Sequence, residues 1–177
     1  SNITTLTGTA ANINSAYTAN GNGSISGLGN EAVTLSDTTL AASVLNDLNG
    51  NTSGVINAGS INTLSGSYAD LNTAFSANGS GISGLGNEAV TITSSVSTAQ
   101  ANTIAAFTSA VVTATLSDGD MATLAGLTET GNAYSITITD SSVAAAALNT
   151  LDGKTTTAVN AGNINPLTGA AADINSA

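Results

Sequence analysis

The chain lacks the side chains on which most enzymes depend. Its 177 residues include no Cys and no His, and Lys154 is the only basic residue. The absence of Cys excludes disulfides, zinc thiolate sites and thiol catalysis, and the absence of His removes the usual general base and the commonest metal ligand. The sequence therefore predicts a protein that is not an enzyme and needs no organic cofactor.

Positive charge is nearly absent. Eleven Asp and Glu residues stand against one Lys, which gives a net charge of −10. Because nucleic-acid phosphates and anionic lipid surfaces are held by Lys and Arg, we expect no nucleic-acid partner. A long uncharged stretch, residues 89–117, is interrupted throughout by Thr, Ser, Gln and Asn. We therefore also expect no membrane insertion.

Large side chains are scarce too, since the chain has two Phe, three Tyr and no Trp. Hydrophobic residues nevertheless make up 41% of the chain and recur at ordered spacing, which argues against low-complexity disorder. A core of Ala, Val, Ile and Leu is thin. Stability should therefore come from stacking many similar modules and not from any one of them.

The chain does contain repeated text. GLGNEAVT begins at Gly27 and again at Gly84, an offset of 57 residues. VTLSDTTLAASVLNDLNG from Val33 aligns with ITITDSSVAAAALNTLDG from Ile136 at an offset of 103. Internal similarity at such periods is typical of repeat arrays.

The first and last parts of the sequence are related as well. ITTLTGTAANINSA at Ile3 and INPLTGAAADINSA at Ile164 share 10 of 14 residues at an offset of 161, and INTLSG at Ile61 belongs to the same set. We therefore expect an excerpt of a longer array that continues on both sides.

Each module has the pattern of a strand followed by a helix. VTLSD alternates apolar and polar residues, as a half-buried strand does, and the apolar positions from Leu40 to Leu48 recur at helical spacing. Asp37 stands where a helix N-cap belongs and Gly50 where a helix ends. Asp140 has the same place as Asp37 in the later copy.

Strand and helix alternating through short turns favour parallel strands and right-handed crossovers. We therefore predict an α/β repeat solenoid with a parallel sheet on one side and helices on the other, running continuously over residues 1–177. Its modules cover approximately residues 3–32, 33–54, 55–89, 90–112, 113–135, 136–158 and 159–177.

GLGNEAVT places a glutamate, Glu31 or Glu88, beside glycines. A glycine loop that holds a ligand is one interpretation. However, a phosphate loop needs Lys before Ser or Thr, and a dinucleotide fingerprint needs a strand before the glycines and a helix after them. We favour a structural turn in which the glutamate accepts hydrogen bonds from neighbouring backbone amides.

Asp118 and Asp120 form the only tight pair of carboxylates. Calcium is bound by carboxylates and carbonyls, with six or more oxygens around the ion, and the glycine-rich calcium nonapeptide is absent. A calcium site at this pair is therefore an alternative to a helix cap at Asp118.

Hydroxyl side chains alternate with the apolar residues of three predicted strands and should point outward. Stacked strands would then present a flat face that resembles the surfaces of ice-binding solenoids. The other interpretation is that Thr is simply a good strand residue on a solvated face. The residues concerned are Thr34, Ser36, Thr91, Thr93, Thr137 and Thr139.

Repeats that combine VTLSD, VNAG, INTLSG, ADINSA and GISGLGNEAVT resemble those of the giant repetitive surface proteins of marine cyanobacteria, including the cell-surface protein that some of them need for swimming. The resemblance covers nearly the whole chain and rests on repeat style and composition. It implies type I secretion and a place on the cell surface or in a filament, and it carries over no catalytic or binding residue.

We therefore expect a structural repeat segment of a long extracellular protein, such as a filament, a surface-layer-like coat or a spacer, that associates with itself or with neighbouring repeats. The alternative is an adhesin or ice-binding module that uses the Thr-lined face and is stabilised by calcium.

Overall fold

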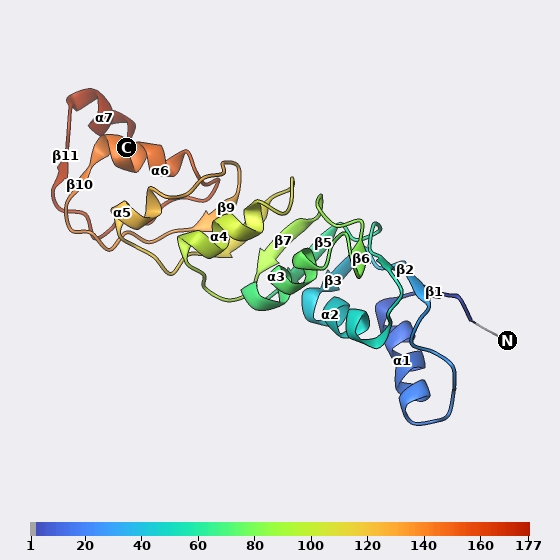
Figure 1. Cartoon of the computed structure of the whole chain (residues 1–177). Coiled ribbons are helices and arrows are strands. Elements are labelled where there is room, and N and C mark those ends of the chain that lie inside the picture. The colour runs from blue at the N-terminus through green and yellow to red at the C-terminus, as the bar shows by residue number, and fades with distance from the viewer. Residues whose placement is uncertain (1–2) are drawn as a thin grey trace. The chain divides into compact units, whose positions relative to one another are not determined.

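The computed structural model describes residues 3–177 and belongs to the α/β class that the sequence predicts. Strands and helices alternate along the chain, and neighbouring strands pair in parallel. The chain divides into two compact units, one that ends at Val90 and one that begins at Thr91 (Figure 1).

The first unit contains three helices and two groups of parallel strands. The helices pack side by side, α1 on α2 and α2 on α3. One group of strands has the order β1-β2-β4-β6 and the other the order β3-β5-β7. The elements are β1 (Thr5–Gly8), α1 (Ala10–Gly21), β2 (Ala32–Leu35), β3 (Thr39–Ala41), α2 (Ala42–Asn51), β4 (Ile56–Asn57), β5 (Thr63–Gly66), α3 (Tyr68–Ser76), β6 (Ile82–Ser83) and β7 (Ala89–Ile92), the last of which extends past the boundary.

The second unit repeats this succession with shorter elements. Strand β8 pairs with β9, and β10 with β11. Helix α5 packs on α6, and α6 on α7. The elements are α4 (Thr98–Ala105), β8 (Val112–Thr115), α5 (Met121–Leu124), β9 (Ala133–Ser135), β10 (Val143–Ala144), α6 (Ala145–Asp152), β11 (Leu167–Thr168) and α7 (Ala171–Ser176).

The core is built from the apolar positions that alternate along the strands. The residues predicted to point inward, Val33, Leu35, Val90, Ile92, Ile136 and Ile138, are all buried. Helices α1 to α6 add further buried residues, such as Ala42, Leu45 and Leu48 on α2, whereas α7 adds none. Small side chains let the helices approach one another closely, and the resulting core is narrow.

Two details of the expected modules are wrong. Leu40 belongs to β3 and not to the helix, because α2 begins only at Ala42. Leu64 likewise lies in β5. Each of these modules therefore inserts a second short strand before its helix, and this second strand pairs in a separate sheet. The prediction of one sheet missed it, because an apolar run of three or four residues fits a strand and a helix equally well.

The expected capping role of Asp37 and Asp140 is also corrected. Neither residue caps the helix that follows it, since α2 and α6 begin after Ala41 and Ala144, which make no side-chain cap. The Oδ2 atom of Asp37 instead accepts from the backbone N–H of Ala10 at 2.8 Å. Ala10 is the first residue of α1, so Asp37 caps the helix of the preceding module.

The same backward cap recurs in the second unit. Asp118 accepts from the N–H of Thr98 at 2.6 Å, and Asp140 from the N–H of Met121 at 2.6 Å. These donors are the first residues of α4 and α5. Since the first N–H groups of a helix have no partner within it, each of these three helices takes one partner from the next module.

The helix's own module supplies the other cap. The side chain of Thr9 accepts from the backbone N–H of Asn12. The side chain of Ser97 accepts from the backbone N–H of Gln100, and the side chain of Gln100 accepts in return from the backbone N–H of Ser97. Among the first N–H groups of each of these helices, one therefore bonds a side chain of its own module and another bonds a side chain of the neighbouring module.

Replacing Asp37 by Ala should lower the free energy of unfolding by about 0.5 to 2 kcal/mol, because the Ala10 amide loses its acceptor. Urea unfolding followed by circular dichroism measures this. Asp47→Ala is the matched control, since Asp47 carries the same charge on the exposed side of α2 and its removal should cost little. Equal losses in the two variants would contradict the cap.

Candidate functional site

The GLGNEAVT segments form two loops, each held in place by an Asn at or just beyond the end of the preceding helix. In the first copy, Asn20 clamps Leu28: its amide donates to the Leu28 carbonyl and its Oδ1 accepts from the Leu28 N–H, at 3.4 and 3.1 Å. In the second copy Asn78 clamps Leu85 in the same way, at 3.0 and 3.3 Å. The two copies of the repeated sequence therefore form the same pair of hydrogen bonds.

The glutamates of the two loops are completely buried. Both carboxylate oxygens of Glu31 accept from the N–H of Gly29 at 2.9 Å. Glu88 accepts from the N–H of Gly86 at 3.0 and 2.9 Å and from that of Asn87 at 3.1 Å. These bonds confirm the prediction of a turn in which the glutamate binds neighbouring amides.

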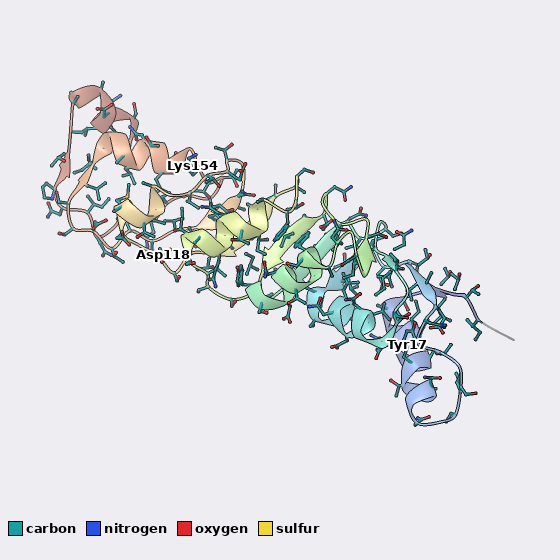
Figure 2. The ribbon with its side chains drawn as sticks, viewed as in Figure 1. Tyr17, Asp118 and Lys154 are labelled. Carbon is teal, nitrogen blue, oxygen red and sulfur yellow. The ribbon has the colours of Figure 1, made fainter. Side chains whose placement is uncertain are left out.

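Glu31 has a further partner from α1. The hydroxyl of Tyr17 donates to its Oε2 at 3.0 Å, and Figure 2 shows Tyr17 near the start of the chain. Burial raises the pKa of Glu31, but hydrogen bonds from the amide of Gly29, the local backbone and the Tyr17 hydroxyl outweigh it, so that the pKa is lowered. The group is therefore an ionised structural acceptor and not a general acid.

Glycine is required in these loops for conformation and for space. Gly29 and Gly86 have φ of 130° and 131°, so the two copies share a backbone shape that side chains disfavour. Gly84 combines a φ of 88° with a close neighbour, because a Cβ there would lie 2.8 Å from the amide nitrogen of Gly59. At Gly84, therefore, two backbone segments lie too close together for a side chain to fit between them.

Asp118 and Asp120 each accept a hydrogen bond at the start of a different helix. Asp118 caps α4, as described above, whereas Asp120 is the N-cap of α5 and accepts from the N–H of Thr123 at 2.8 Å. Hydrogen bonds from Thr123 lower the pKa of Asp120. Within residues 3–177, no group of three or more His, Cys, Asp or Glu residues is arranged to hold a metal ion.

The hydroxyl residues of the predicted binding face do not form one continuous file. Thr34 lies on β2, in register with Thr7 and Asn57, whereas Thr91 lies on β7, which belongs to the other group of strands. Ser36 and Thr93 are exposed just beyond these strands, and Thr137 and Thr139 are exposed in the second unit. Thr137 forms a parallel bridge with Asn160.

The second unit also has an apolar hollow of about 270 Å³ beside α5 and α6. Met121, Leu124, Leu151 and Lys154 contribute to its lining. The Lys154 ammonium donates to the carbonyl of Thr128 at 3.1 Å (Figure 2). The cation therefore bonds a backbone group of the preceding module, and the residues that line the hollow include no carboxylate.

A set of Asn side chains links α2, α4 and α6 to the module that follows each of them, and the sequence interpretation missed it. The Nδ2 atom of Asn46 donates to the carbonyl of Asp70 at 3.0 Å, and that of Asn149 to the carbonyl of Asp173 at 3.0 Å. Asn102 repeats the link in α4 with a bond of 2.8 Å to Gly126. In all three links the Asn lies 24 residues before its partner, and this common spacing is the signal in the sequence that could have revealed them.

Side chains complete the strand ladders in a similar way. The Oδ1 atom of buried Asn132 accepts from the N–H of Val112 at 2.8 Å. Thr155 uses its hydroxyl to bond both the N–H and the carbonyl of Tyr134, at 2.9 and 2.8 Å. The polar side chains of the second unit therefore serve the backbone of a neighbouring module.

Glu31→Gln should lower the free energy of unfolding at pH 7 by about 1 to 3 kcal/mol, because the bonds to a charged acceptor weaken. The folded pKa of Glu31 lies below the ordinary 4.5. Its ionised form therefore stabilises the fold above about pH 4.5, and this contribution is lost as the pH falls through the folded pKa.

Unfolding measured from pH 3 to pH 7 should show the difference between Glu31→Gln and the unmodified chain shrinking on acidification. Asp47→Asn, an exposed carboxylate change, serves as the control. A difference that stays constant over this range would contradict a charged Glu31.

Comparison with known proteins adds no identity to these observations. None of the family models, curated proteins or solved structures compared with the chain matches it. Within residues 3–177 no helix combines the length and apolar character needed to cross a membrane. The interpretation of this chain therefore rests on its own residues.

Proposed function

We propose that the chain is a non-catalytic structural segment of a long extracellular protein, in which strand-plus-helix modules stack as a right-handed solenoid. The protein would serve as a filament, a surface coat or a spacer. The single observation that carries this proposal is that polar side chains reach from one module to the backbone of a neighbouring module, before or after it. Asp37, Asn46, Asn102, Asp118, Asp140, Asn149 and Lys154 all make such bonds.

A catalytic site gathers several polar groups around one point, usually in a cleft. Here the bonds are distributed along the chain at separations of 19 to 27 residues and follow the module spacing. Such a distribution stabilises length, because each module is held by its neighbours. The observation supports a mechanical role over a catalytic one.

Composition supports a place outside the cell. The chain has no Cys to be oxidised and a single Lys or Arg after which a trypsin-like protease could cut. Its repeats also resemble those of giant bacterial surface proteins. These features suit an exposed polymer, and the net charge of −10 keeps such a surface from adhering to other anionic surfaces.

The alternative of an adhesin or ice-binding module is less well supported. It needs an extended, regular file of hydroxyl groups, and the in-register file through Thr7 and Thr34 continues with Asn57 and Ser83. Asn57 therefore presents an amide and Ser83 a hydroxymethyl group where the row would need the methyl and hydroxyl of another Thr. The file therefore lacks the chemical regularity that the alternative requires.

An antibody against residues 1–177 should label the outer surface of intact source cells in immunogold electron microscopy. The native protein isolated with this antibody should appear as long particles in the electron microscope. A cytoplasmic protein labelled in parallel checks that the cells are intact. Label that appears only after lysis would contradict the extracellular role, and short globular particles would contradict the array.

A further inference from the structure

Apolar residues of the last module are exposed to solvent at positions where the matching residues of an earlier module are buried. Ile174 on α7 is 43% exposed, whereas Leu71, the matching residue at the offset of 103, is 0% exposed. Leu167 is half-buried, and its match Leu64 is fully buried. The same sequence pattern therefore has a covered copy in the first unit and an open copy in the second.

The covering of the first copy is known in detail. Strand β6 pairs with β4 through Ile56 and Ile82, and the N–H of Ala89 at the start of β7 donates to the carbonyl of Asn62 at 2.9 Å. The strands that pair with this module thus come from GISGLGNEAVT and its continuation into β7, which lies next to β5 and its Leu64. The chain itself shows what fits this surface.

The open copy offers the same backbone edge. Among the residues that the structure describes, β11 pairs only with β10, so its other edge carries no strand. Pro166 stands at the place of Thr63 and has no N–H, but the Thr63 N–H bonds Thr38 of the preceding module. Pro166 therefore removes a backward bond and leaves the forward edge intact.

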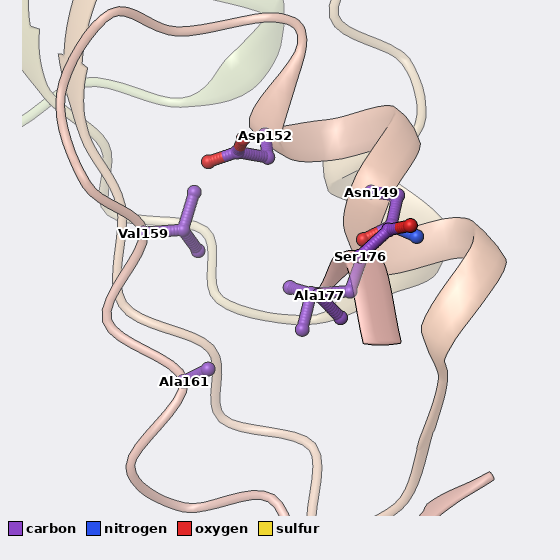
Figure 3. A pocket seen from close by; sticks show the side chains of 7 residues that line it. Asn149, Asp152, Val159, Ala161, Ser176 and Ala177 are labelled. Atoms are coloured by element: carbon purple, nitrogen blue, oxygen red, sulfur yellow. The ribbon is translucent and has the colours of Figure 1, made fainter. Parts of the chain in front are cut away.

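The last module also has an open pocket of about 140 Å³. It is lined by α6, the loop at Val159 and Ala161, and the end of α7 at Ala177 (Figure 3). The matches of Val159 and Ala177 in the first copy, Ile56 and Ala74, are both fully buried. In that copy Ala74 is followed directly by Phe75, which is buried as well.

We propose that the face formed by Leu167, Ile174 and this pocket is a docking surface for one more strand–helix segment with the pattern of residues 75–105, joined in the same polypeptide. Its aromatic residue fills the pocket, its first strand pairs beside Val159, and its GLGNEAVT strand pairs with β11. The proposal rests on the proposed array and names the partner of its open face.

An extended chain tests this directly. Residues 75–105 are appended after Ala177, where they follow the same Ala as in the first copy. Because the chain has no Cys, Ile174→Cys introduces a single thiol whose reaction with a maleimide reports its exposure. We expect the thiol to react about tenfold more slowly, or slower still, in the extended chain than in the 177-residue chain, since modification then needs local opening.

Two controls make the result specific. The same extension carrying Ile82→Asp and Val90→Asp replaces the residues that point inward, and it should leave the thiol reactive. Val111→Cys, at another exposed position of the second unit, should react equally fast with and without the extension. Circular dichroism checks that each protein is folded.

Unchanged reactivity of the thiol at position 174 in the extended chain would overturn the proposal, as would equal protection by the Asp-substituted extension. Protection that grows with concentration in the unextended chain would also overturn it, because the occupant would then be a second copy. None of these results bears on cell-surface labelling, so the proposed function fails or stands separately.

Discussion

The fold depends on backbone groups that a module cannot satisfy by itself. A short helix leaves its first N–H groups and last carbonyls without partners, and a strand of two to four residues leaves both edges open. In this chain carboxylates of the next module supply some of the missing N–H partners, and Asn amides add bonds to carbonyls of the next module. Asp37 on the Ala10 amide and Asn46 on the Asp70 carbonyl act in opposite directions along the chain. The module of residues 33–54 is therefore tied to both of its neighbours.

A thin core makes these bonds more important. Burial of an Ala contributes little compared with a Phe or a Trp, and the chain has two Phe and no Trp. A hydrogen bond contributes about 0.5 to 1.5 kcal/mol net, but an unpaired buried group costs more. Spread over many modules, such bonds fix the register between neighbours, which apolar contacts among small side chains specify weakly. The distribution of polar residues thus follows the stacking and leaves few of them for chemistry.

Sequence alone predicts much of this structure because its signals are local. The inward residues of the strands, the α/β class and the turn role of Glu31 and Glu88 follow from alternation, repetition and the absence of a ligand motif. The partner of Asp37 could not be found in this way. An Asp before a helix has the usual place of an N-cap, and only the parallel stacking of modules brings it to Ala10, 27 residues earlier. The second strand before α2 and the separation of Thr34 from Thr91 are likewise decided by pairing between distant segments.

The central claim is that a carboxylate of one module caps the helix of the module before it, as Asp37, Asp118 and Asp140 do for α1, α4 and α5. Amide hydrogen exchange resolved to single residues tests this in the Asp118→Ala variant. The account predicts faster exchange at Thr98, the first residue of α4, while Thr123 of α5 keeps its protection because Asp120 still caps it. Faster exchange at Thr123 with no change at Thr98 would mean that Asp118 serves the following helix, and this would contradict the claim.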